Sequence, residues 1–246
     1  MLENKDKEKV KTFLNNSQLR ELMDTFDCSI KSIDYKGEKI SKEELKAFID
    51  NGSDSCPQFS YFKNPITNTH PYQEINLSQL YEVIHNPKYF KERTEKLRNI
   101  ENEDGQQIYK RRNFDYVTFS GTFTYHNDRS LSAHTGYICL DFDEIDDCGD
   151  LKQRLLKDEE VETEMLFISP SGGGLKWIVQ VDIQHSIEEC KEDHLSYFEA
   201  LEYHILDTYD IPIDKSGKNV SRACYIPHDP DVFINPKYLR NDTTRF

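Results

Sequence analysis

No two of the six cysteines are spaced as C-x-x-C, and the eight histidines form no H-E-x-x-H motif. Structural zinc sites and disulfide frameworks need closely spaced ligands or paired cysteines, so we expect neither in this chain. The cysteines are scattered along the sequence: Cys28, Cys56, Cys139, Cys148, Cys190 and Cys224.

Long apolar runs are also missing, because none approaches the roughly 20 residues that cross a bilayer. The first residues, MLENKDKEKVK, lack the apolar stretch of a signal peptide. We therefore expect a soluble cytoplasmic protein without a membrane partner. The sequence has no G-x-x-x-x-G-K-[ST] motif either. A helicase or ATPase that works with it would be a separate domain or protein.

Positive charge is scarce, with 31 Lys and Arg against 45 Asp and Glu and a formal net charge of -14. This balance argues against unselective binding to nucleic acid through overall charge, although it leaves room for a local basic groove. Taken alone, a basic stretch is usually a solvated helix face. Such a stretch lies upstream of the acidic segment: Lys88, Lys91, Arg93, Lys96, Arg98, Lys110, Arg111 and Arg112.

The segment GYICLDFDEI has the pattern of a strand that ends in two aspartates. Strand alternation places Asp141 and Asp143 on one face, and Leu140 and Phe142 on the opposite face. The Cα atoms of the aspartates would be roughly 6 to 7 Å apart, from two rises of about 3.3 Å. Two such carboxylates can hold a hard cation between them. The alternative is a strand that continues into an acidic, solvated loop.

The order of elements after Tyr116 predicts a fold. The expected elements are the strand GYICLDFD, a helix at 150–157, strands at 164–169 and 175–182, a helix at 188–208 and a strand near ACYIP. This β-α-β-β-α-β order is that of ferredoxin-like and RNA-recognition-motif folds. We therefore predict an α+β protein with a ferredoxin-like palm in residues 106–246. Residues 1–105 would form a helical and mixed α/β extension, continuous with the palm, with helices after Asn76 and at 88–100.

Such a palm brings distant residues together. Its sheet order is 4-1-3-2, so the first strand is central and its carboxyl end meets the starts of the third and fourth strands. Those starts carry SPSGGGLK, residues 169–176, and IDKSGKNVSRACY, residues 213–225. We expect Lys176 on the same open face as the two aspartates, with Asp214 and Arg222 beside them.

These clusters together provide what nucleotide polymerisation requires. Carboxylates hold Mg²⁺ at the attacking and leaving oxygens, while cations and backbone N–H groups hold a triphosphate. Each cluster has an ordinary alternative when taken singly. The Gly run would be a flexible hairpin turn, Lys176 a snorkelling surface residue, Arg222 a surface ion pair and Asp214 a turn acid.

Four segments in combination resemble the VirE N-terminal-domain family, which is similar to the archaeo-eukaryotic primase (primase-polymerase) superfamily. They are YKRRNFDYVTFSGTF, SAHTGYICLDFDEI, FISPSGGGLKWIV and IDKSGKNVSRACYIPHDPDVFIN, and the likeness extends over most of residues 70–235. The resemblance implies a nucleotidyltransferase in a replication or mobile-element protein. Its cofactor would be Mg²⁺ or Mn²⁺, and its partners would be nucleoside triphosphates and a single-stranded DNA template.

The resemblance also implies roles for single residues. Asp141, Asp143 and Asp214 would hold metal and act in catalysis. Lys110, Arg111 and Arg112 are expected to contact template phosphates. Nucleotide binding would fall to Ser169, Ser171, Gly172, Gly173, Gly174, Lys176 and Arg222.

One departure from the family pattern leaves other hypotheses open. Active primases of the superfamily typically carry a histidine on the second-motif strand, where this chain has Lys176 and Trp177. The chain could therefore be a catalytically inactive nucleic-acid-binding or replication-initiator module of the same fold. A metal-dependent nuclease that uses the same carboxylates is a more distant alternative. In each case we expect one module of a larger protein.

Overall fold

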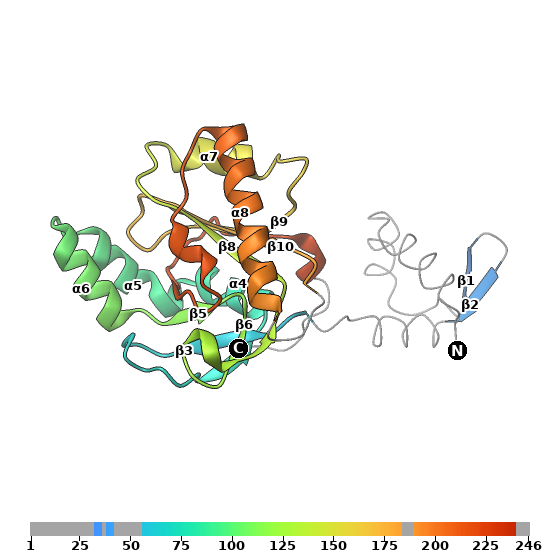
Figure 1. The fold of residues 1–246 in the computed structure, drawn as a ribbon, viewed down its shortest axis with the longest axis horizontal. Helices are drawn as coiled ribbons and strands as arrows, with labels where there is room; N and C mark the ends of the chain where they lie inside the picture. Colours follow the sequence, from blue (N-terminus) through green and yellow to red (C-terminus); the bar gives the residue numbers. More distant parts are fainter. Residues whose placement is uncertain (1–31, 36–37, 42–55, 184–188, 240–246) are drawn as a thin grey trace. The chain divides into compact units, whose positions relative to one another are not determined.

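The computed structural model describes residues 32–35, 38–41, 56–183 and 189–239. Contacts divide the chain into two units, Met1–Asp54 and Ser55–Phe246. The described part of the first unit is an antiparallel hairpin of β1 (Ser32–Tyr35) and β2 (Glu38–Ser41), drawn in blue in Figure 1. Most of the first 55 residues of the expected extension lie outside the described residues.

The second unit is α+β, as the sequence predicted (Figure 1). Its strands are β3 (Phe59–Phe62), β4 (Gln73–Ile75), β5 (Tyr116–Thr118), β6 (Gly121–Phe123), β7 (Leu131–His134), β8 (Tyr137–Phe142), β9 (Thr163–Ile168), β10 (Leu175–Gln180), β11 (Cys224–Tyr225) and β12 (Phe233–Ile234). Its α-helices are α4 (Leu77–His85), α5 (Pro87–Arg98), α6 (Glu103–Asn113), α7 (Cys148–Leu155) and α8 (Cys190–Tyr209). No helix in these described ranges is long and apolar enough to cross a membrane.

One antiparallel sheet, in the order β12-β9-β10-β8, carries the expected acidic strand at its edge. The apolar face of β8 packs in a buried cluster with residues of α7 and α8. Leu140 and Phe142 belong to this cluster together with Trp177 of β10, so the predicted alternation of β8 is confirmed. Burial of side chains of this size contributes about 1.5–3 kcal/mol each and fixes the register of the strand.

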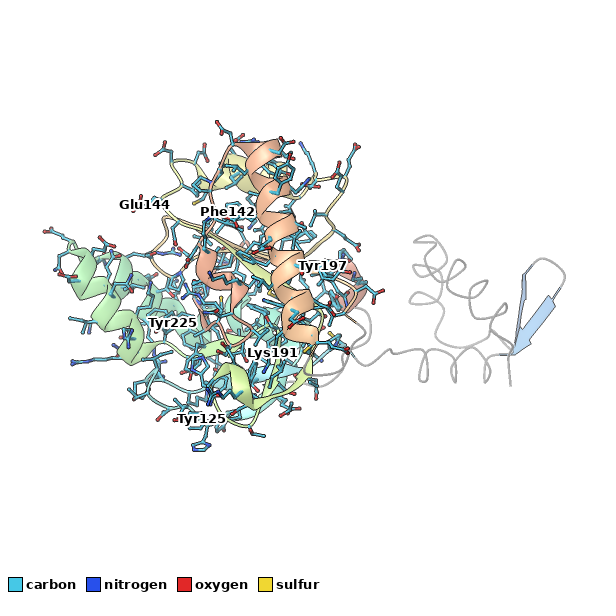
Figure 2. The ribbon with its side chains drawn as sticks, in the orientation of Figure 1. Tyr125, Phe142, Glu144, Lys191, Tyr197 and Tyr225 are labelled. Atoms are coloured by element: carbon cyan, nitrogen blue, oxygen red, sulfur yellow. The ribbon has the colours of Figure 1, made fainter. Side chains whose placement is uncertain are left out.

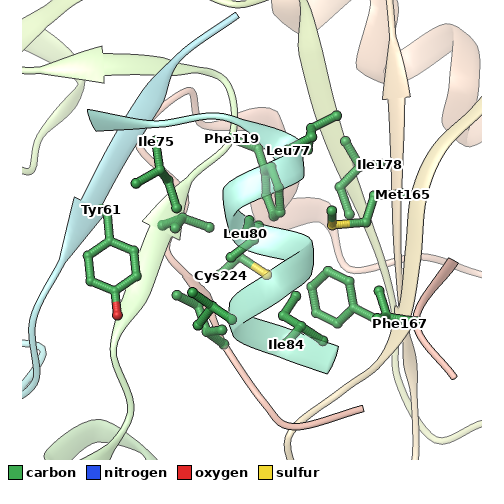
Figure 3. Packing of buried hydrophobic residues seen from close by; sticks show 14 of the residues in the cluster. Tyr61, Ile75, Leu77, Leu80, Ile84, Phe119, Met165, Phe167, Ile178 and Cys224 are labelled. Carbon is green, nitrogen blue, oxygen red and sulfur yellow. The ribbon is translucent and has the colours of Figure 1, made fainter. Parts of the chain in front are cut away.

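A second antiparallel sheet has the order β11-β5-β3-β4, and α4 lies between the two sheets (Figure 3). Leu80 and Ile84 of α4 belong to the same buried cluster as Met165 and Ile178 of the first sheet. The face of the first sheet that we expected to be open is therefore covered along most of its length. The expected helix after Asn76 is confirmed as α4.

The predicted order 1-3-2 is confirmed as β8-β10-β9, but the position of the fourth strand is wrong, because β8 lies at the edge of its sheet and, among the described strands, pairs with β10 alone. The expected fourth strand, β11, pairs instead with β5 of the second sheet. Residues beside β8 form the 3₁₀ turn η2 (Lys215–Lys218), which is capped by the side chain of Asp214. A capped turn uses its backbone groups locally, so this segment cannot continue as a ladder strand.

Residues 59–105, which we assigned to an N-terminal extension, fold together with the rest of the second unit. Strand β3 pairs with β5, and α5 contributes Phe90 and Leu97 to the core around α4. The sequence analysis did not predict α6, which begins after the cap residue Asn102 and carries a basic last turn. Cations in a last turn favour the helix because they face its negative end.

Candidate active site

The end of β8 places Asp141 opposite Lys176 of β10. The two residues are direct partners in the antiparallel register, and their side chains form an ion pair. Side chains that are cross-strand partners project from the same face of a sheet, which is the relationship that the sequence predicted. Both side chains are largely buried, with 8% and 12% of their surface exposed. Asp143 follows just beyond the end of the strand.

The third carboxylate arrives from the segment that follows α8. The backbone N–H of Asp214 donates to the carbonyl oxygen of Asp141 at 2.9 Å, which fixes this segment to the edge strand. The Asp214 carboxylate accepts hydrogen bonds from the backbone N–H and the hydroxyl of Ser216, at 2.9 and 2.6 Å. One carboxylate oxygen each from Asp141, Asp143 and Asp214 lie within 4.8 Å of one another. The sequence therefore identified three acids that meet.

Two cations, Lys176 and Arg222, pair with these carboxylates. Arg222 donates from Nη2 to Oδ2 of Asp214 at 2.8 Å, and the same nitrogen lies 3.7 Å from Oδ2 of Asp141. Lys176 also pairs with Oδ2 of Asp141. The other oxygen of that carboxylate, Oδ1, is buried and has no hydrogen-bond partner within the described chain. A buried carboxylate oxygen without a partner costs free energy, so this atom is suited to an external ligand.

The local charges move the pKa values of the acids in opposite directions. Partial burial and the neighbouring Asp141 raise the pKa of the Asp143 carboxyl. Burial alone would also raise the pKa of Asp214, but the hydrogen bonds from Ser216 and the charge of Arg222 lower it overall. The surrounding residues thus stabilise the negative charge of Asp143 less than that of Asp214.

The two nearest lysines also differ in pKa. Burial lowers the pKa of Lys176, but the adjacent Asp141 outweighs burial and the net shift is upward. Lys110, which α6 directs toward the same region, has a lowered pKa because of burial and the positive charge of Lys176. An additional negative group in the cavity would therefore favour the charged form of Lys110.

These side chains line a cavity of about 710 Å³. In Figure 2, Phe142 marks the end of β8 and Tyr225 marks β11, two elements that border it. The predicted residues Ser169, Ser171, Lys110 and Arg111 also lie on its wall. Arg112 does not, and instead lines a neighbouring depression with Arg111.

The Gly-rich turn lines the site with Ser169, Pro170 and Ser171 and not with its glycines. Gly172, Gly173 and Gly174 are absent from the cavity wall. Their positions have structural reasons: Gly172 has a φ of 90°, and a Cβ on Gly174 would overlap the carbonyl oxygen of Phe142. Arg98 donates to the carbonyl oxygens of Ser169 and Pro170, at 3.3 and 3.2 Å, and anchors the start of the turn.

Sequence reasoning missed part of the cavity wall. The segment from His126 to Asp128 lines it, and the hydroxyl and backbone N–H of Ser221 donate to Asp128, the latter at 3.1 Å. Ile66 enters from the loop after β3. No motif marks these residues, because tertiary contacts alone bring their loops to the site. The remaining wall residues are Gln107, Pro170, Asn219, Ala223 and Tyr225.

The comparisons with known proteins place this site inside a family. Searches of curated proteins and of solved structures gave no match. The profile of the family described as BT4734-like, N-terminal domain, matches residues 109–233, about half of the chain. The matched segment includes the three clustered aspartates together with Lys110, Lys176 and Arg222. The chain therefore belongs to the BT4734-like, N-terminal domain family.

Proposed function

We propose that this chain is a metal-dependent nucleotidyltransferase of the primase-polymerase type, acting on a single-stranded DNA template within a replication or mobile-element protein. One observation carries the proposal: Asp141, Asp143 and Asp214 converge in a cavity whose wall also carries Lys110, Lys176 and Arg222. A wall that carries these acids and cations together suits a ligand that brings both a metal and phosphates.

The acids fit Mg²⁺ or Mn²⁺. Both ions prefer oxygen ligands, and the cluster offers three carboxylate oxygens within 4.8 Å, beside the unpartnered Oδ1 of Asp141. Such an ion supplies charge stabilisation for the oxygens of a transferring phosphoryl group. The chain's own contribution is to hold the three carboxylates at this separation before any ligand arrives.

The cations are placed for the phosphates of a nucleoside triphosphate. Arg222 has 41% of its side chain exposed, so its guanidinium can reach a ligand while staying close to Asp214. Charge-assisted contacts of this kind contribute about 1.5–3 kcal/mol each. Ser169 and Ser171 add hydroxyl groups at the start of the turn, 3.3 Å from one another.

The proposed likeness to a primase-polymerase palm rests on element order and on the acids. The order β8, α7, β9, β10 and α8 agrees with that fold, and the Asp-x-Asp lies at the end of its first strand. The position of β11 in the other sheet departs from it. The segment capped by Asp214 occupies the side of β8 where a fourth strand would pair.

One observation favours an inactive binding module as a second candidate. Lys176 is buried and already paired with Asp141, so its charge offsets an acid that a metal would need. Trp177, the other residue at the position of the family's histidine, is buried on the opposite face and donates to Thr163 at 2.8 Å. A module of this kind would keep the fold and the template contacts without turnover.

Calorimetry with Mn²⁺ and then a nucleoside triphosphate, followed by strand synthesis on single-stranded DNA, tests these alternatives. Asp141→Asn should lower Mn²⁺ affinity and abolish synthesis. Asp207→Asn, an exposed acid on α8 outside the cavity wall, is the matched control. Template binding without synthesis by the wild type would favour the inactive module, and strand degradation would indicate a nuclease. Absence of both Mn²⁺ and triphosphate binding would reject the proposed enzyme.

A further inference from the structure

A track of three connected depressions leads away from the acid cluster along the loop after β3. The cavity described above shares Ile66 and Arg111 with a second depression of about 400 Å³. That depression shares Thr67 with a third, of about 340 Å³. Shared wall residues mean that the three are neighbours, so a chain-like ligand at the acids can continue outward without leaving the surface.

The walls of the two outer depressions are positively charged, whereas the whole chain is negatively charged. Their walls contain Lys63, Arg111, Arg112 and His70, and no Asp or Glu. Neither arginine takes part in an ion pair within the described residues. Although the protein has a formal net charge of -14, these walls carry cations without carboxylates, which favours binding of a polyanion.

The positive charge of Lys63 is partly neutralised, because its Nζ pairs with the buried Asp115 at 3.1 Å. The larger share of the positive charge therefore falls on Arg111 and Arg112, in the last turn of α6. Lys110 of the same turn points into the main cavity instead. The three consecutive basic residues thus differ in position. Lys110 lines the main cavity, Arg111 lines both the main cavity and the second depression, and Arg112 lines the second depression alone.

Exposed apolar side chains, two of them aromatic, accompany the charge. Tyr72, on the wall of the third depression, is 62% exposed, and Ile108, on the wall of the second, is 53% exposed. Tyr125 is 40% exposed and meets His70 edge to face, with ring centroids 5.1 Å apart. Figure 2 shows Tyr125 at the lower edge of this unit. Aromatic surfaces interleaved with cations are the pattern by which proteins bind single strands, since every base can stack.

The loop that forms this track is held in place. Asp115 accepts hydrogen bonds from the backbone N–H and the side-chain amide of Asn64, at 2.9 and 2.6 Å. The backbone N–H of Ile66 donates to the carbonyl oxygen of Arg111 at 2.9 Å. The backbone N–H of His126 donates to the carbonyl oxygen of Thr69 at 2.8 Å. A surface already ordered loses less entropy on binding.

We propose that single-stranded nucleic acid binds along this track, with bases stacked on Tyr72 and phosphates next to Arg111 and Arg112. The direction of the strand, toward the acids, rests on the proposed function, whereas the binding surface does not. Ile108 is the one exposed large aliphatic residue among those described on the walls of the two outer depressions, whereas a peptide helix needs several apolar pockets for its anchors at i, i+3 and i+7.

The test is fluorescence anisotropy with a labelled oligodeoxythymidine of about 16 nucleotides, the upper end of a single-strand site. Tyr72→Ala should weaken binding by about fivefold or more, the lower limit for loss of one stacked base. Tyr203→Ala, which removes a tyrosine that is 72% exposed on α8, is the matched control and should have no effect.

Arg112→Gln should flatten the slope of log affinity against log salt by about 0.7, the contribution of one phosphate contact on a single strand. Lys157→Gln, at an exposed position after α7, is its control. Neither Tyr72→Ala nor Arg112→Gln should alter binding of Mn²⁺ or of a nucleoside triphosphate, because both residues lie outside the main cavity.

The outcomes separate this inference from the proposed function. Full-strength oligonucleotide binding by both track variants, or no binding by the wild type, would overturn the inference even if the enzyme synthesises strands. Track-dependent binding in a protein that takes up neither Mn²⁺ nor triphosphate would support the inference and reject the proposed function. Thermal unfolding of each variant checks that the fold is intact.

Discussion

Lys176 and Asp141 face each other across the neighbouring strands β10 and β8 and form a largely buried ion pair at the base of the cavity. The pairing leaves one oxygen of Asp141 without a partner while neutralising the other. A lysine in this place does two opposing things. It lowers the cost of burying a carboxylate in the free protein, and it competes with any cation that the carboxylates would bind.

The first prediction concerns this competition. Lys176→Met removes the lysine charge and should strengthen Mn²⁺ binding, because the acids lose their internal cation. The same change should weaken triphosphate binding by about tenfold, the loss of one charge-assisted contact. Calorimetry with each ligand checks both directions. Weaker binding of both ligands would mean that Lys176 shapes the site and does not compete.

The stability of Lys176→Met should fall by about 3 kcal/mol, the lower end for breaking a buried pair, since Arg222 remains 3.7 Å from Asp141. The double variant Lys176→Met with Asp141→Asn should recover most of this loss, because no buried charge is left alone. Urea unfolding without metal measures both. Equal stability of the single and double variants would show that the pair is effectively solvated.

The second prediction concerns the two acids with opposite pKa shifts. The pKa of Asp143 is raised, so its charged form is disfavoured in the fold and it costs stability above the ordinary carboxyl pKa. Asp143→Asn should therefore stabilise the metal-free protein at neutral pH, and the gain should vanish in acid. Mn²⁺ affinity of the wild type should fall as the pH drops through the raised pKa, because protons then compete for Asp143.

Asp214 behaves in the opposite way. Its lowered pKa contributes stability above the ordinary carboxyl value, and this contribution is lost as the pH falls through the lower folded value. Asp214→Asn should therefore destabilise the metal-free protein at neutral pH, and should also weaken Mn²⁺ binding. Urea unfolding of both variants across acidic pH measures these trends. Parallel stability changes in the two variants would contradict the opposite shifts.

The convergence of the three acids could be predicted from the sequence, but for a partly mistaken reason. Strand alternation correctly placed Asp141 with Lys176, because the period of a strand depends only on local geometry. We expected Asp214 to arrive on a fourth strand beside β8. It arrives instead as the cap of a 3₁₀ turn that donates one backbone hydrogen bond to the same edge. A segment that forms a capped turn and a segment that begins a strand can have similar residues, so the sequence alone did not distinguish them.

The covered face of the first sheet and the track along the β3 loop could not be predicted. Both depend on where α4 and residues 63–72 pack, and such contacts between distant segments have no local signature. Taken alone, the triple-glycine turn indicated an ordinary hairpin turn, and its glycines were assigned to nucleotide binding through the family resemblance. These glycines do not line the cavity. Close packing against β8 is enough to explain why a glycine occupies position 174, so phosphate binding is not needed to explain it.

The third prediction concerns a pair of histidines, the partly buried His134 and the buried His194, that supports the Asp214 segment. The backbone N–H of Gly136 donates to Nδ1 of His134 at 2.9 Å, so the proton of that ring lies on Nε2. His134 then donates to Nδ1 of His194 at 3.1 Å. His194 in turn donates from Nε2 to the carbonyl oxygen of Gly217, also at 3.1 Å. This relay requires both rings to be neutral.

Burial lowers the pKa of His134 from 6.5 to about 4, and it lowers that of His194 as well. The unfolded chain therefore binds more protons than the fold between about pH 4 and 6.5, and stability falls as the pH falls through that window. His134 alone should account for roughly 2 kcal/mol between pH 7 and pH 5. Urea unfolding of the wild type and of His134→Gln measures it, and the variant should show a shallower loss.

If the relay positions the segment, His194→Ala should weaken Mn²⁺ binding through Asp214, and His134→Gln, which can still donate to His194, should weaken it less. Exposed His70, in the β3 loop, offers the matched control, since His70→Gln should leave both stability and Mn²⁺ affinity unchanged. A loss of stability in His194→Ala with unaltered Mn²⁺ affinity would limit the relay to a structural role.

The last prediction compares two adjacent glycines of the β9–β10 turn. A Cβ at Gly174 would overlap the carbonyl oxygen of Phe142, a backbone atom that cannot move without shifting the end of β8. A Cβ at Gly173 meets nothing within 4 Å. Gly174→Ala should therefore lose about 1–3 kcal/mol of stability and displace the aspartates from one another. Gly173→Ala should leave stability equal or slightly improved, because alanine restricts the unfolded chain.

The same pair decides whether the turn itself binds phosphate. With the glycines off the cavity wall, Gly173→Ala should bind Mn²⁺ and nucleoside triphosphate as the wild type does, whereas Gly174→Ala should lose both through displacement of β8. Calorimetry with Mn²⁺ and with the triphosphate, together with urea unfolding, gives three values for each variant. A stable Gly173→Ala protein that binds Mn²⁺ normally but has lost triphosphate affinity would place the phosphates against the turn backbone, because only a close backbone approach would be blocked by one methyl group.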